Sequence, residues 1–142
     1  MTRRSLLAVF PFARVLAANY MLGSRLSDGS MFFSGFRNGY ACETVIKSLA
    51  DGTIQKFEAT ITARRDVVAE ALLSAAGYTP VYKSGFTGLS GGLVVRVEDV
   101  EGDFNLLVDG QLFLNEGVGT KRLTNGQKLT VRALPGAKLS AK

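Results

Sequence analysis

Short runs in which apolar and polar residues alternate, separated by glycine-containing turns, fill most of the chain after residue 40. In the run at 53–62, Phe57, Ala59 and Ile61 alternate with polar residues, which is the period expected of a strand with one buried face. Runs of this kind lie at 40–49, 53–62, 93–98, 104–114 and 128–133. The pattern predicts an antiparallel β-sandwich or a barrel-like domain, because the apolar faces of such strands need a second layer to cover them.

Glycine-containing turns set the boundaries between these strands. Asp51-Gly52, Asp109-Gly110 and Asn125-Gly126 each follow or precede an alternating run, and glycine accepts the positive φ that tight hairpin turns require. Pro135-Gly136 ends the last run. With 142 residues, of which 46% are hydrophobic, we expect one domain with a substantial core.

One segment, residues 64–76, is rich in Ala and Leu and predicts the only strong helix. Thr62 is expected to cap its start, and Gly77 fits the left-handed position just past its end. Its expected buried stripe consists of Val68, Leu72 and Ala75, with Ala71 beside them. The fold class is therefore mainly β with one helix (α+β), and a helix on one face of a single sheet remains an alternative to the sandwich.

The first 39 residues predict an N-terminal arm followed by a loop rich in glycine and aromatic residues. A helical stripe runs through the arm and Gly23 would end it; the stripe consists of Phe12, Val15, Leu16, Asn19 and Tyr20. Residues 23–40 predict a loop or a short irregular strand. The expected organisation is thus an arm and loop at 1–39, a β-rich domain at 40–136 and a frayed tail at 137–142.

Charge is segregated along the chain. Residues 1–40 hold five Arg and one acid, residues 98–116 hold six acids and no base, and residues 117–142 hold six bases and no acid. Opposite charges on separate segments favour binding either to further copies of the chain or to a polyanion. The net charge of +5 permits contact with nucleic acid but does not require it.

The sequence lacks most of the residues and motifs that enzymes commonly use for catalysis. It contains no His, so the usual Ser–His and Cys–His pairs cannot form, and no phosphate-binding glycine motif is present. Cys42 is the only cysteine and lies in an alternating run, which indicates a buried side chain. We expect no enzyme activity, no catalytic residue, no cofactor and no metal site.

The sequence predicts a location in the cytoplasm and no secretion. A lone cysteine favours a reducing interior over secretion. The apolar N-terminus imitates a secretory signal, but Pro11 and Arg14 interrupt it. No run reaches the roughly 18–20 apolar residues of a membrane span, so we expect none.

Two further clusters carry alternative interpretations. Glu98, Asp99, Glu101 and Asp103 form an acidic face with the spacing of calcium ligands; a solvated turn fits better, because the closing Glu of a calcium loop is missing. The second cluster combines rings and a cation, as sites for single-stranded nucleic acid do, although core or interface packing is the favoured interpretation; it consists of Phe32, Phe33, Phe36, Arg37 and Tyr40.

The closing run Asn125-Gly126-Gln127-Lys128-Leu129-Thr130-Val131-Arg132 resembles the last strands of immunoglobulin-like modules. A compact β-domain of this size with a glycine-punctuated arm is similar to small structural proteins of phage virions, namely capsid decoration proteins and tail components. The resemblance implies a non-enzymatic scaffold that binds a symmetric lattice through its arm. The helix at 64–76 departs from a plain immunoglobulin-like pattern.

The expected function is therefore structural assembly, with the chain itself or other structural proteins of a particle as partners. Apolar arm residues would be buried on a neighbour while arm arginines meet its acidic face; the arm residues concerned are Arg3, Arg4, Leu6, Leu7, Val9, Phe10, Phe12, Arg14, Val15 and Leu16. The alternative is a small nucleic-acid-binding module that uses the basic arm and the aromatic loop.

Overall fold

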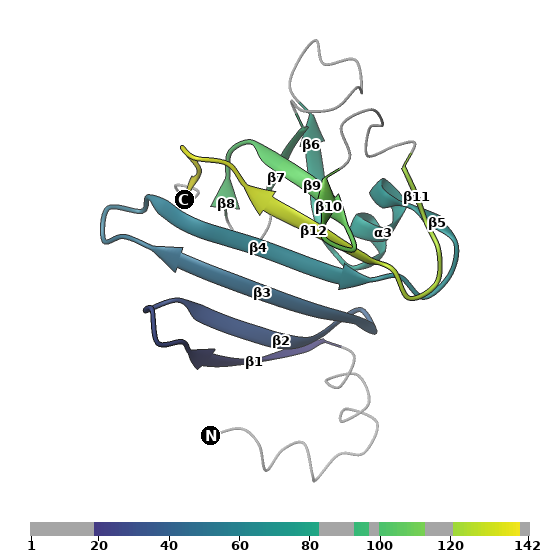
Figure 1. Ribbon diagram of the computed structural model, residues 1–142, viewed down its shortest axis with the longest axis horizontal. Helices are drawn as coiled ribbons and strands as arrows, with labels where there is room; N and C mark the ends of the chain where they lie inside the picture. Colours follow the sequence, from purple (N-terminus) through teal and green to yellow (C-terminus); the bar gives the residue numbers. More distant parts are fainter. Residues whose placement is uncertain (1–18, 83–92, 97–99, 113–120, 140–142) are drawn as a thin grey trace, which may run out of the picture.

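A computed structural model describes residues 19–82, 93–96, 100–112 and 121–139, and the structural statements below concern these residues. The arm at 1–18, with Glu98 and Asp99, lies outside them. One antiparallel sheet of seven strands dominates, in the order β1-β2-β3-β4-β12-β9-β10 (Figure 1). Its strands are β1 (Tyr20–Arg25), β2 (Met31–Arg37), β3 (Tyr40–Ser48), β4 (Ile54–Thr62), β9 (Phe104–Val108), β10 (Gln111–Leu112) and β12 (Lys128–Ala133).

Three short strand pairs and one helix complete the fold. The pairs are β5 (Val67–Val68) with β11 (Arg122–Leu123), β8 (Val100–Glu101) with β13 (Lys138–Leu139), and β6 (Thr79–Tyr82) with β7 (Leu93–Arg96). The helix α3 (Ala69–Ala75) has seven residues, and no helix in the described part is long and apolar enough to cross a membrane. The prediction of a mainly β chain with one helix is confirmed, and the large sheet does not close into a barrel.

The core lies on one face of the sheet and is formed by the residues that the alternation singled out. The register aligns Ile61 with Leu129, and Leu129 in turn with Val108, so these buried side chains of β4, β12 and β9 point to the same side. Phe57 and Phe104 meet edge to face, with ring centroids 6.1 Å apart. Leu72 and Leu73 of α3 belong to the same buried cluster, so the helix is the second layer over this half of the sheet.

The turns predicted by glycine are confirmed. Gly52 has φ +92° in the β3–β4 hairpin, Gly110 has φ +83° between β9 and β10, and Gly126 has φ +92° before β12. Gly77 (φ +89°) ends α3 as expected, and the N–H of Tyr78 donates to the carbonyl of Leu73. Cys42 is buried, as its position in an alternating run predicted.

The predicted start of the helix is wrong. The helix begins at Ala69 instead of near residue 64, and Val68 occupies the capping position without a side-chain hydrogen bond, so Thr62 is not the cap. The cause is a distant strand: Val67 and Val68 pair with Leu123 and Arg122. The buried stripe shifts accordingly, since Ala69, Leu72 and Leu73 are buried while Ala71 is exposed.

The structure also differs from what was predicted for the two segments that flank the β-rich domain. Tyr20 belongs to a strand and not to a helix, and the segment expected to be a loop or a short irregular strand instead forms the second half of β1 and all of β2, two regular strands of the main sheet. Residues 137–139, expected to belong to a frayed tail, are part of the fold, because Ala137 is buried and Lys138–Leu139 pairs with β8; residues 140–142 lie outside the described part. The N–H of Leu139 also donates to the carbonyl of Gly52, which ties the C-terminal residues to the β3–β4 turn.

Two carboxylates stabilise the turns at one end of the sheet, and this predicts a response to acid. Asp28 accepts from the N–H of Ser30 and Asp51 from the N–H of Thr53, each over 2.9 Å, and these backbone hydrogen bonds lower the pKa of both carboxyls below the ordinary value of 3.8. A lowered folded-state pKa means that the stabilisation is present above pH 3.8 and is lost as the pH falls through the folded value. We expect the amide signals of Ser30 and Thr53 in NMR spectra to shift as these carboxyls become protonated below pH 3.8. Replacing Asp28 and Asp51 by Asn should abolish this pH-dependent shift.

Candidate functional site

The strands β1, β2 and β3, which we call the wing (residues 20–48), lie at one side of the sheet, beyond the strands that α3 and its neighbours cover (Figure 1). In β4 every second residue is buried, as in a strand with one covered face. In β1 five of six residues are exposed, and in β2 six of seven are only half-buried. Neither face of the wing is therefore fully covered by the described part of the chain.

The outer wing face, opposite the core, carries most of the exposed apolar side chains of the wing, with Ser24, Ser34 and Glu43 among them. The cross-strand register brings Tyr20 beside Phe36 and Phe36 beside Ala41, with the two rings 6.3 Å apart between centroids. Leu22 is 66% exposed, Tyr20 42% and Phe36 38%. The apolar members of this face are Tyr20, Leu22, Phe32, Phe36, Ala41 and Val45. A shallow depression of about 380 Å³ is lined by four of them, Tyr20, Leu22, Phe36 and Ala41, together with polar residues that include Ser34, Glu43 and Thr60.

The inner wing face continues the core side of the sheet and is also apolar. Met21, Phe33, Thr44 and Ile46 line a groove of about 410 Å³. Thr44 is only 3% exposed, and its hydroxyl makes no hydrogen bond within the described part of the chain. Antiparallel sheets commonly bury one face and hydrate the other. An apolar character on both sides of the wing thus indicates a contact surface.

Two glycines allow β1 to lie this close to β2. A side chain at Gly23 would come within 2.6 Å of the Phe33 ring, which covers the glycine from the neighbouring strand. A side chain at Gly35 would overlap the backbone carbonyl oxygen of Tyr20. The Gly35 contact is the stricter of the two, because backbone cannot rotate away as an aromatic ring can.

The aromatic cluster found in the sequence is divided by the fold. Phe32 and Phe36 lie on the outer wing face and Phe33 on the inner one. Arg37 and Tyr40 flank the β2–β3 turn, at the end of the sheet next to α3. The five residues therefore do not form one loop.

Arg37 binds the backbone carbonyls at the C-terminal end of α3. Its guanidinium lies 4.1 Å from the centre of the Tyr78 ring and donates to the carbonyls of Ala76 over 3.1 Å and Gly77 over 3.4 Å. Asn38 adds a bond to the Ala75 carbonyl over 3.0 Å. These are the carbonyls that a helix leaves without partners at its C-terminus, so Arg37 is a structural cation.

Within the described residues, the acidic and basic blocks of the sequence meet inside the chain. Glu101 lies opposite Lys138 in the β8–β13 pair, and Asp109 accepts from the N–H of Lys128 over 2.9 Å. Asp103 lies in the bend before β9, and its carbonyl accepts from the N–H of Leu134. The described residues contain no group of three or more acids or cysteines suited to a metal ion. Charge separated along the sequence is thus partly matched across neighbouring strands.

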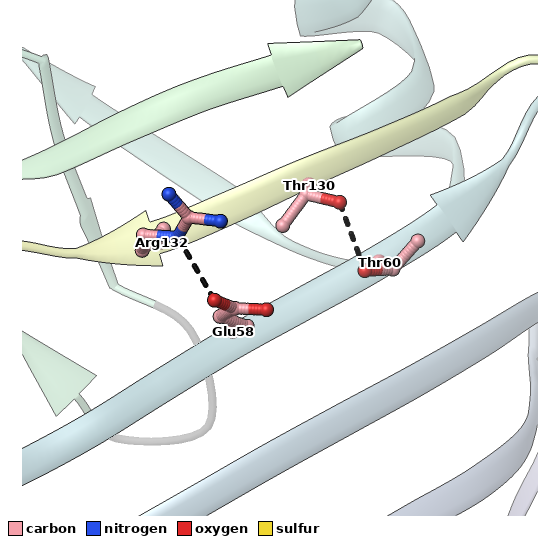
Figure 2. A network of polar contacts seen from close by, with 4 residues as sticks. All are labelled: Glu58, Thr60, Thr130 and Arg132. Atoms are coloured by element: carbon pink, nitrogen blue, oxygen red, sulfur yellow. Dashed lines mark hydrogen bonds and ion pairs between the residues drawn. The ribbon is translucent and has the colours of Figure 1, made fainter. Parts of the chain in front are cut away.

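Past the wing, the outer face of the sheet becomes polar. Between β4 and β12, Arg132 forms an ion pair with Glu58 over 2.8 Å, and the hydroxyls of Thr60 and Thr130 are 3.0 Å apart (Figure 2). These side chains face away from the core, since Ala59 and Ile61 between them are buried. We call these four residues the polar ladder, and it marks one limit of the apolar outer wing face.

Sequence reasoning missed several residues of the wing surface. Met21 and Leu22 were not singled out, because the apolar residues at 12–20 had suggested a helix. Ile46 was placed in the run at 40–49 but was not recognised as part of a surface. The available signal was the consecutive apolar triplet Tyr20-Met21-Leu22, which places apolar side chains on both faces of any strand. No protein-family model, curated protein or solved structure matches the chain.

Proposed function

We propose that the protein is a non-enzymatic structural assembly protein that binds neighbouring subunits through its wing. The observation that carries the proposal is the wing itself, three strands with apolar side chains on both faces and with exposed Leu22, Tyr20 and Phe36 on the outer one. Contact surfaces with aromatic and aliphatic anchors are typical of stable protein–protein interfaces. Residues 1–18 lead directly into β1, so the basic apolar arm joins the described structure at this surface.

Several hundred Å² of apolar wing surface would supply several kcal/mol to such a contact at ~25 cal/mol per Å², before ordering costs are subtracted. The arm residues Arg3, Arg4, Leu6, Leu7 and Phe10 would extend the same contact. The resemblance to capsid decoration proteins and tail components supports a virion as the particle. Ordered particles in electron micrographs of material carrying the chain from its natural host would support that assignment, and their absence would contradict it.

The nucleic-acid alternative gains no support from the described residues. Its only cation among the clustered rings, Arg37, is held by Ala76, Gly77 and Tyr78. Phe33 lies on the other face of β2 from Phe32 and Phe36, so the cluster as a whole does not offer one stacking platform. The assembly function is therefore the better supported of the two.

Replacing Tyr20 and Leu22 together by Ser is expected to weaken association of the full chain at least tenfold, because each buried apolar side chain contributes about 1.5–3 kcal/mol. Native mass spectrometry over a concentration series measures the effect. Leu49→Ser with Leu112→Ser is the matched control, since both residues are similarly exposed but lie outside the outer wing face. Association that is unaffected by the wing pair, or a wild-type chain that stays monomeric throughout, would contradict the proposal.

A further inference from the structure

The strand β1 is a free edge of the seven-stranded sheet. Hydrogen-bonded and non-bonded pairs alternate along an antiparallel ladder. The N–H of Leu26 donates to the carbonyl of Ser30 at the turn, so counting back from this pair assigns Tyr20, Leu22 and Ser24 to the bonds with β2. The backbone groups of Met21, Gly23 and Arg25 consequently point away from the sheet. No strand in the described part of the chain pairs with them.

This edge lacks most of the features that usually prevent pairing. Protected edge strands are very short or carry proline, lysine, bulges or inward charges. β1 has six residues, carries no proline or lysine, and pairs with β2 in a continuous register. Its one charged residue, Arg25, lies on the core side of the sheet but is exposed at the last position of the strand. The opposite edge, β10, has only two residues. The fold thus presents one long unprotected edge, continuous with the apolar faces of the wing.

We propose that a second copy of this chain pairs with this edge, β1 antiparallel to β1 about a two-fold axis at Leu22, so that the two sheets form one. The proposal rests on the assembly function and names the partner of the same surface. About four N–H···O bonds would form, two between Met21 and the partner's Gly23 and two between Gly23 and the partner's Met21. A closed two-fold contact of this kind uses one surface twice, which fits a main sheet whose described strands leave a single free edge of this length.

Side chains favour this register over its neighbours. Leu22, the most exposed large apolar residue of the described part, would meet the partner's Leu22 on the outer face. On the inner face Met21 would lie beside the partner's Gly23 and would pack against the Phe33 ring that covers this glycine. The two copies of Arg25 would sit at opposite ends of the shared strand pair, so their like charges would be far apart. An axis at Gly23 would instead place Leu22 opposite the partner's Ser24.

Disulfide cross-linking tests the register directly. In a Cys42→Ala background, Leu22→Cys should form a disulfide-linked dimer under mild oxidation, because opposed residues of a non-bonded pair have Cα atoms about 4.5 Å apart, within the range that a disulfide spans. Ser24→Cys is the control on the same face of the same strand. In the proposed register its two copies lie roughly 13 Å apart, so it should not cross-link.

Each other pattern of cross-linking overturns the proposal. Linkage of both variants would indicate parallel strands, linkage of Ser24→Cys alone would indicate another register, and linkage of neither would mean that β1 has a different occupant, such as the arm. Loss of association in the Tyr20 and Leu22 serine variant without any cross-link would leave the assembly function standing and reject this partner. A wild-type chain that never associates would reject both.

A charge exchange gives a second readout at a site too exposed to affect folding. Leu22→Lys and Leu22→Glu should each weaken dimerisation at least tenfold, since each places like charges opposite one another and removes the apolar contact. An equal mixture of the two chains should form heterodimers, detected by native mass spectrometry. Two variants that dimerise as wild type, or a mixture that stays monomeric, would count against a two-fold axis at Leu22.

Discussion

Gly35→Ala is expected to detach β1 from the sheet while the core stays folded. The added methyl group would overlap the carbonyl oxygen of Tyr20, and since that oxygen belongs to the backbone, relief requires the strand to move. Overpacking of this kind typically costs 1–3 kcal/mol or more, roughly what a terminal strand gains by pairing. Association through the wing should fall with it. In two-dimensional NMR spectra, the dispersed amide signals of residues 20–25 should disappear while those of β4, β9 and β12 remain.

Ser34→Ala is the matched control, because Ser34 neighbours Gly35 on β2 but faces the outer side. It should leave the signals of β1 in place. If Gly35→Ala keeps the dispersed signals of residues 20–25, the close approach of β1 to β2 is not a constraint of the fold. If it instead unfolds the whole protein, the wing is not separable from the core.

Arg37→Ala should lower the free energy of unfolding by about 2–3 kcal/mol. The substitution leaves the carbonyls of Ala76 and Gly77 without a charged donor and removes the cation from the Tyr78 ring. Arg37→Lys should recover only part of the loss, since an ammonium group cannot reproduce the planar fork that stacks and donates at once. Urea unfolding curves of the full chain measure both effects.

Arg25→Ala provides the comparison, because Arg25 is exposed at the end of β1, and such substitutions usually change stability by less than about 0.5 kcal/mol. The same variants separate a structural from a nucleic-acid role for Arg37. A structural cation predicts that polynucleotide binding and its salt dependence are the same with and without the guanidinium. Weaker binding at unchanged stability would restore the nucleic-acid interpretation.

The strands after residue 40 could be predicted because their information is local. Alternation at Phe57, Ala59 and Ile61 and the turn at Asp51-Gly52 are visible within a few residues. The start of α3 could not be predicted in this way, since Val67 and Val68 are held as a strand by Arg122 and Leu123, more than fifty residues away. Local helix propensity contains no information about this pairing with a distant strand.

The wing was missed for a related reason. Glycine weakens the expectation of a strand, so residues 23–40 suggested a loop. In the fold, Gly23 and Gly35 are what allow β1 and β2 to approach each other, a requirement that exists only once the two strands are neighbours. The charge blocks show the same limit, because antiparallel strands bring Glu101 and Lys138 side by side although they lie far apart in sequence.

The polar ladder has a consequence for any subunit that rests on the outer wing face. Moving such a subunit from the wing toward β12 would place its apolar contact area on the Glu58–Arg132 ion pair and would require removing water from both charges. Sliding in that direction is therefore opposed by the sheet itself. The ladder acts as a rim that fixes where a neighbour stops, so the placement of subunits is determined within this chain and not only by what it binds.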